Sequence, residues 1–251
     1  MHTMHLGVYQ WQFASIMWLL VFIVMGGSPE ENLKEMWRDF QEFWRMHPTP
    51  GRYQYIGMSM FQSEDNKFPC LKGRAGEIKQ LTRALLHAWE KHRQRNKEAP
   101  DYIVHRQIGR MLSKFIFLDQ ALDNHPPQDY PCLPDDIKHR FIRECWDVLA
   151  VMKYVHNYYV DNFVLIPGTA NAKPLFNLTI KCHSLTHIAQ AAETMNPRLS
   201  ICYSGEDYMK HCKNLMKSVI TGNNAIRAGR RFTEKMQYAL HQEFSQATVL
   251  R

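Results

Sequence analysis

Residues 6–25, LGVYQWQFASIMWLLVFIVM, are the most apolar window of the chain, and they most limit what it can fold into. Such a segment must leave water, either in a protein core or in a bilayer. Its uninterrupted apolar part, residues 16–25, is short of the roughly 20 residues that span a membrane. Extending it back to Leu6 brings in Gln10, Gln12 and Ser15. The pattern favours a buried core helix, with a membrane anchor as the alternative. A signal peptide is disfavoured because residues 1–5 carry no Lys or Arg.

Long amphipathic helices are predicted along the rest of the chain. Ser28, Pro29 and Glu31 form a capping-box pattern that starts the next helix, which ends before the prolines at 48 and 50. Further helical periods begin near Ala75, Asp101 and Asp135, whereas residues 52–68 fit either a short strand or an irregular crossing. The rows expected to face the core are Leu33, Met36, Trp37, Phe40, Phe43 and Trp44; Ile78, Leu81, Leu85 and Trp89; Ile108, Met111, Leu112, Phe115, Leu118 and Leu122; and Ile137, Phe141, Cys145, Val148, Met152, Val155 and Tyr159. The sequence therefore predicts a mainly all-α fold, a multi-helix bundle.

The chain is expected to form a single helical domain over residues 1–251. The connector at residues 125–134 holds four prolines and is the clearest linker. It suggests a subdivision into residues 1–125 and residues 134–251, the second part carrying the basic region.

The net charge and the cysteines indicate which partners and which cellular compartment the chain suits. A net charge of +7 and a pI near 9.1 suit an anionic partner, nucleic acid first and a membrane surface second. Six cysteines without a C-x-x-C pair indicate reduced thiols and an intracellular protein, nuclear if it binds DNA. The sequence has no phosphate-loop, dinucleotide or G-x-S-x-G motif, so nucleotide hydrolysis and serine-esterase chemistry have no support.

His183 and His187 stand four residues apart, so a helix places both imidazoles on one face, as a metal site requires. Cys182 projects about 100° away from His183 and is a poor third ligand. The glutamate of a zinc-protease motif is absent between the two histidines. Structural, hydrogen-bonded histidines are the favoured interpretation, and a metal-dependent enzyme using these histidines with Glu206 is the alternative.

A basic stretch follows an acidic helix start near the C-terminus. Ser204 is a candidate helix cap, and Glu206 and Asp207 fall in the first turn, where the helix dipole favours them. The candidate nucleic-acid-binding residues are Lys210, Lys213, Lys217, Arg227, Arg230 and Arg231. Together they predict DNA as a partner.

Aromatic residues are frequent in residues 135–162. Trp146, Tyr154, Tyr158 and Tyr159 could stack on nucleic-acid bases, but their interleaving at helical spacing favours core and boundary positions.

Three segments resemble proteins encoded by CACTA-like transposons and the repetitive reading frames related to them. MHTMHLGVYQ (residues 1–10) resembles their D-x-M-H-x-x-D-L-G-V-x-Q segment, and LKGRAGE (71–77) resembles their L-K-G-K-A-A-E turn into a helix. K-x-H-x-L-x-H (181–187, with His183 and His187), N-P (196–197) and YSGED (203–207) resemble their closing segment, which a Lys-rich helix follows.

The resemblance implies the helical insertion and C-terminal part of a ribonuclease-H-like transposase, which would hold Mg²⁺ with acidic residues. Glu206 would match the final catalytic glutamate. His5 stands where the family carries the second Asp of its motif, and the first carboxylate would lie upstream of Met1. The chain is therefore expected to be a catalytically incomplete piece of a longer reading frame that binds nucleic acid at most, with an upstream fragment or a second copy as a partner. A membrane-anchored helical protein is the alternative from another class.

Overall fold

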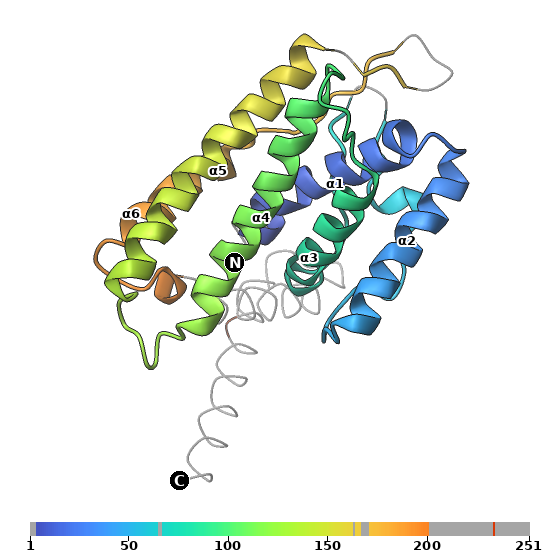
Figure 1. The fold of residues 1–251 in the computed structure, drawn as a ribbon. Helices are drawn as coiled ribbons and strands as arrows, with labels where there is room; N and C mark the ends of the chain where they lie inside the picture. Colours follow the sequence, from blue (N-terminus) through green and yellow to red (C-terminus); the bar gives the residue numbers. More distant parts are fainter. Residues whose placement is uncertain (1–3, 65–66, 163, 167–170, 201–232, 234–251) are drawn as a thin grey trace. The chain divides into compact units, whose positions relative to one another are not determined.

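The computed structural model describes residues 4–64, 67–162, 164–166, 171–200 and Thr233 (Figure 1). Its helices are α1 (Gln10–Leu19), α2 (Pro29–Met46), α3 (Ala75–His92), α4 (Tyr102–Asn124), α5 (Asp135–Asp161) and α6 (Ile180–Ala191). Within those residues the only β-type pairing is an isolated bridge between Leu165 and Ala172. The prediction of a mainly all-α fold is confirmed.

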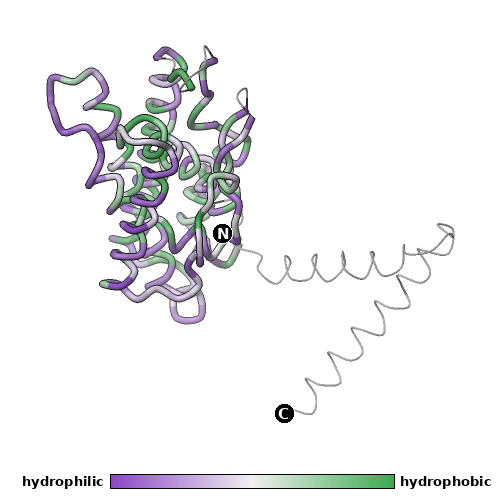
Figure 2. Tube along the Cα trace, turned by 90° about the vertical axis from the view of Figure 1, so that its right-hand side faces the viewer, coloured by the Kyte–Doolittle hydropathy of each residue, from purple (hydrophilic) through white to green (hydrophobic). Residues whose placement is uncertain are grey.

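The chain divides into two compact units, Met1–Ile201 and Cys202–Arg251, and the six helices belong to the first. In that unit the helices from α2 to α6 pack in chain order, each against the next (Figure 1). Hydrophobic and hydrophilic stretches alternate along the helices, as expected of amphipathic segments (Figure 2).

The apolar N-terminal segment forms one continuous helix, Met4–Val24, in which π-helical turns at Met4–Tyr9 and Leu20–Val24 flank α1; we call it the first helix. By length and composition alone it could cross a membrane, with a mean hydropathy of 1.5 over its most apolar window. In the bundle, 72% of that window is buried. The first helix packs against α2, α3 and α6, so it forms the centre of the core.

Polar side chains of the first helix anchor the segment that leads into α6. Ser15 is fully buried, and its Oγ accepts a hydrogen bond from the backbone N–H of Phe176 at 2.8 Å. Gln12 Nε2 donates to the carbonyl of Asn177 at 3.0 Å. Phe176 itself is buried at a positive φ of 57°, a conformation that non-glycine residues rarely adopt. The Ser15 contact and the stacking of Phe176 on Tyr159, with ring centroids 5.1 Å apart, hold it there.

Helix starts and core rows follow the sequence patterns closely. The Ser28 side chain caps α2, Glu31 completes the capping box, and Pro29 is the first helical residue. The apolar rows predicted for α3 and α4 are buried, as is the α5 row except for its half-buried first member, Ile137. Residues 52–68 cross irregularly where they are described, with a 3₁₀ turn at Met58–Met60.

The proline-rich connector between α4 and α5 lies within the first unit and is fixed by Asn196. Asn196 is fully buried, and its Nδ2 donates to the carbonyls of His125 and Tyr130, each at 2.8 Å. Its backbone N–H donates to the carbonyl of Pro131 at 2.7 Å. One asparagine just before a proline thus binds three backbone carbonyls of this connector.

Candidate functional site

The predicted histidine pair lies on the exposed side of α6. The rings of His183 and His187 are 4.6 Å apart in an edge-to-face arrangement. His187 Nδ1 is 3.2 Å from Gln190 Oε1, a contact within the same helix. Cys182 points instead into the core, where burial raises the pKa of its thiol. Among the described residues, no three His, Cys, Asp or Glu side chains are grouped so that they could hold a metal ion.

The other predicted site residues lie outside the described residues. They are Glu206, with its proposed metal-binding role, and the basic set Lys210, Lys213, Lys217, Arg227, Arg230 and Arg231.

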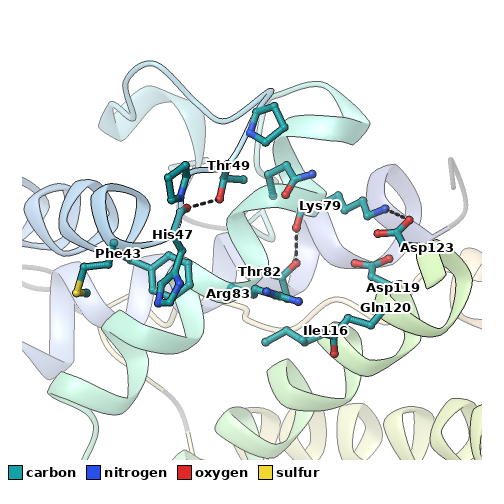
Figure 3. A pocket seen from close by; sticks show the side chains of 14 residues that line it. Phe43, His47, Thr49, Lys79, Thr82, Arg83, Ile116, Asp119, Gln120 and Asp123 are labelled. Carbon is teal, nitrogen blue, oxygen red and sulfur yellow. Dashed lines mark hydrogen bonds and ion pairs between the residues drawn. The ribbon is translucent and has the colours of Figure 1, made fainter.

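A pocket of about 440 Å³ opens between the end of α2, the Pro48–Thr49–Pro50 turn, α3 and α4 (Figure 3). Its polar lining carries both signs of charge. Lys79 Nζ on α3 contacts Asp123 Oδ1 on α4 at 2.5 Å, and Thr82 Oγ1 donates to the Lys79 carbonyl at 2.9 Å. Arg83 forms no ion pair with another described residue. The pocket can therefore hold a small polar molecule, but it does not gather one type of charge.

Asp119 lines the same pocket (Figure 3), and its carboxylate also contacts His5 of the first helix. Asp119 Oδ1 is 2.9 Å from His5 Nε2, and the His5 side chain is fully buried. His5 Nδ1 has no hydrogen-bond partner among the described residues. A carboxylate oxygen accepts hydrogen bonds, so Nε2 is the donor in this contact. Asp119 thus provides the buried Nε2 donor with an acceptor.

Tyr9 completes this buried group. Its ring meets His5 edge-to-face at 4.8 Å, and its hydroxyl donates to the Phe115 carbonyl at 3.3 Å. Burial, reinforced by the negative charge of Asp119, raises the pKa of the Tyr9 phenol well above its usual value. Tyr9 is therefore a neutral hydrogen-bond donor within the core.

A second buried carboxylate joins α2 to α3. Asp39 accepts from Lys91 Nζ at 2.6 Å and contacts His92 Nε2 at 2.7 Å. The hydrogen bond to Asp39 raises the pKa of the Lys91 ammonium. Both Asp39 and Asp119 are engaged by internal partners, so they act first as ties between helices.

The segments that carry the resemblance lie close together in the fold. The Leu71 N–H donates to the Gln10 carbonyl at 3.0 Å, and Thr179, directly before α6, donates to the Gly7 carbonyl at 3.3 Å. Gly73 is required because a Cβ there would fall 1.8 Å from the Tyr53 hydroxyl oxygen. The segments at 71–77 and 181–187 thus both lead into or lie in helices that pack against residues 4–9 of the first helix.

Sequence reasoning did not identify Asp119 or Phe176, and it marked Asn196 only as part of a resembling segment. For Asp119 the available signal was a carboxylate within an otherwise apolar row of α4. Neither Asn196 nor Phe176 belongs to a periodic pattern that could have indicated its role.

Comparison with family models, with curated proteins and with solved structures finds no match to this chain.

Proposed function

We propose that this chain is a transposon-derived helical protein that binds DNA through the phosphate backbone and lacks a complete set of catalytic carboxylates. The observation that carries the proposal is its charge distribution. The chain has a net charge of +7, and from Arg198 to the C-terminus nine Lys and Arg face only four Asp and Glu. Neutralising phosphates with such cations releases counterions and gives binding that is indifferent to sequence.

The site chemistry around His5 supports the catalytic part of the proposal. Where the resembling family carries an Asp, this chain has a buried imidazole whose Nε2 already contacts Asp119. Mg²⁺ prefers oxygen ligands, and it usually retains several coordinated waters. A buried histidine does not fit that requirement, so the residues at this position do not suit Mg²⁺ and no cleavage step is assigned to the chain.

The test measures duplex DNA binding by the full chain at a series of salt concentrations. Fluorescence anisotropy reports the binding, and duplexes of unrelated sequence are compared. A variant carries Gln at Lys210, Lys213, Lys217, Arg230 and Arg231. We expect wild-type affinity to fall linearly with the logarithm of salt concentration. The variant should lose up to about 4–5 units of that slope, because each phosphate contact contributes about 0.9.

A matched control removes the same amount of charge from the first unit. It carries Gln at exposed cations of α2 and of the turn before α3: Lys34, Arg38, Arg45, Lys72 and Arg74. If both variants lost the same amount of salt slope, the binding would depend on net charge and not on the C-terminal cations. Wild-type protein that leaves the duplex unbound at low salt would overturn the proposal.

A membrane-held helical protein is a second candidate, favoured by the length and hydropathy of the first helix. It requires the first helix to leave the core, where Ser15 and Gln12 bind the segment before α6. Cell fractionation separates the two. Detergent-dependent recovery that is lost when residues 1–27 are deleted supports the membrane, and full-length protein in the soluble fraction rejects it.

A further inference from the structure

The side of α5 that faces away from the bundle is exposed along most of the helix; we call it the outward face of α5. α5 lies at the edge of the row of helices, with α4 and α6 as its neighbours (Figure 1). The exposed side chains along it are His139, Arg143, Trp146, Ala150, Lys153, Tyr154, Asn157 and Val160. Their spacings of three, four and seven residues place them on one side of the helix.

Two large aromatic side chains stand on this face in contact with water. Trp146 is 47% exposed and Tyr154 is 45% exposed. Of the four aromatic residues considered for base stacking, only Tyr159 is a core residue, and Tyr158 is half-buried with its hydroxyl 3.4 Å from the Pro100 carbonyl. Trp146 and Tyr154 are therefore exposed positions and not core residues.

Between the two ends of α5, where Asp135, Asp136 and Asp161 are exposed, the charge on the outward face has one sign. Arg143 and Lys153 are exposed, and neither forms an ion pair with another described residue. The carboxylates in the middle of α5, Glu144 and Asp147, turn toward α4, where both contact Lys114. Between the exposed Asp136 and Asp161 at the helix ends, the outward face therefore carries cations and no carboxylate.

We propose that the outward face of α5 binds single-stranded nucleic acid, with Trp146 and Tyr154 stacking on bases and Arg143 and Lys153 contacting phosphates. Aromatic platforms between cations are how proteins hold single strands without sequence preference. The rings are eight residues apart, or about 12 Å along the helix axis. A stacked strand advances about 3.4 Å per nucleotide, so the two rings would engage bases about three to four nucleotides apart.

Base stacking also separates this surface from the proposed duplex binding. In a duplex both faces of an internal base are covered by neighbouring pairs, so Trp146 and Tyr154 gain nothing from it. A single strand leaves those faces open. The outward face of α5 thus shares its class of partner with the proposed function but is a different surface with a different preferred form of nucleic acid.

The test uses the full chain and a fluorescein-labelled oligothymidylate longer than a site of about 4–16 nucleotides, with a duplex of the same length in parallel. The variant is Trp146→Ala with Tyr154→Ala. We expect its affinity for the single strand to fall at least about tenfold, because each stacked base contributes measurably to binding. Its affinity for the duplex should stay within about twofold.

Two further variants keep the result interpretable. Trp146→Phe with Tyr154→Phe retains both ring faces and should restore most of the single-strand affinity. Arg143→Gln with Lys153→Gln should weaken single-strand binding and reduce its salt dependence. The matched control Lys97→Gln with Arg106→Gln, at exposed cations outside this face, should have a smaller effect.

Several outcomes would overturn the inference. They are unchanged single-strand binding in the double alanine variant, equal losses for single strand and duplex, and no single-strand binding by the wild type. A loss of self-association in that variant, measured by sedimentation, without a change in DNA binding would assign the face to a second copy of the chain. Single-strand binding that depends on Trp146 in a protein that does not bind duplexes would uphold this inference and reject the proposed function.

Discussion

The first helix and α6 both carry histidines, and their environments are opposite. His5 of the first helix is fully buried, and its Nε2 contacts Asp119, 114 residues away in the sequence. His183 and His187 of α6 are exposed and contact each other and Gln190 of the same helix. Neither of these two side chains ties α6 to another described helix.

The difference shows what residue spacing can and cannot reveal. Two histidines four residues apart indicate a candidate metal site because any helix places them on one face. Spacing does not tell whether that face is inside or what stands opposite it. His5 belongs to no such pair, yet its burial requires a partner, because an unpaired polar group in a core costs free energy.

Removing the buried histidine should have the largest effect on stability. His5→Ala opens a cavity beneath Tyr9 and leaves the Asp119 carboxylate without its partner, so we expect a loss of about 3–5 kcal/mol in the free energy of unfolding. Urea denaturation followed by far-UV circular dichroism measures it. The matched variant is His183→Ala on α6. Similar losses for the two would contradict the contrast between the two regions.

A smaller effect is expected at the polar contact between the first helix and the segment before α6. Ser15→Ala leaves the buried N–H of Phe176 without an acceptor, which should cost about 1–3 kcal/mol. Ser113→Ala on α4 is the control, because the Ser113 hydroxyl also donates to the carbonyl four residues earlier, as that of Ser15 does. Thermal unfolding of the two variants compares them directly. If Ser113→Ala were as costly as Ser15→Ala, the contact with Phe176 would not be the source of the loss.

The smallest effect should come from the exposed pair. Among the described residues, the ring contact and the hydrogen bond of these two side chains lie within α6, so His183→Ala with His187→Ala should change stability by no more than about 0.5 kcal/mol. Metal analysis of the purified wild type and variant extends the test. Stoichiometric zinc that disappears in the variant would mean that a ligand outside the described residues completes a site on α6.

Much of the fold was predictable because its local signals agree. The Ser28–Glu31 capping box fixes where α2 begins, and the apolar periods of α3, α4 and α5 fix their inner rows. Gln12 and Ser15, which argued from the sequence against a membrane span, turn out to hold the segment before α6 in the core.

The site was less predictable. The sequence marked His183 and His187 by spacing, and most other marked residues fall in the part of the chain that the structure does not describe. The apolar row formed by Cys182, Leu185 and Ala189 could have indicated that both histidines point outward, since it occupies the side of α6 that faces α5. Trp146 and Tyr154 fall outside the apolar row predicted for α5, and that was the available signal for their exposure. Their exposure depends on α5 lying at the edge of the bundle.

The sequence by itself determined the helices, their inner faces and the excess of positive charge, because helix periodicity and capping are local and charge is additive. Only the tertiary structure decided which residues meet across the chain. The pairing of His5 with Asp119, the anchoring of the connector by Asn196 and the positive φ of Phe176 are examples. Each depends on a partner far away in the sequence, and burial makes that partner necessary because a polar group in the core must find its hydrogen bond there.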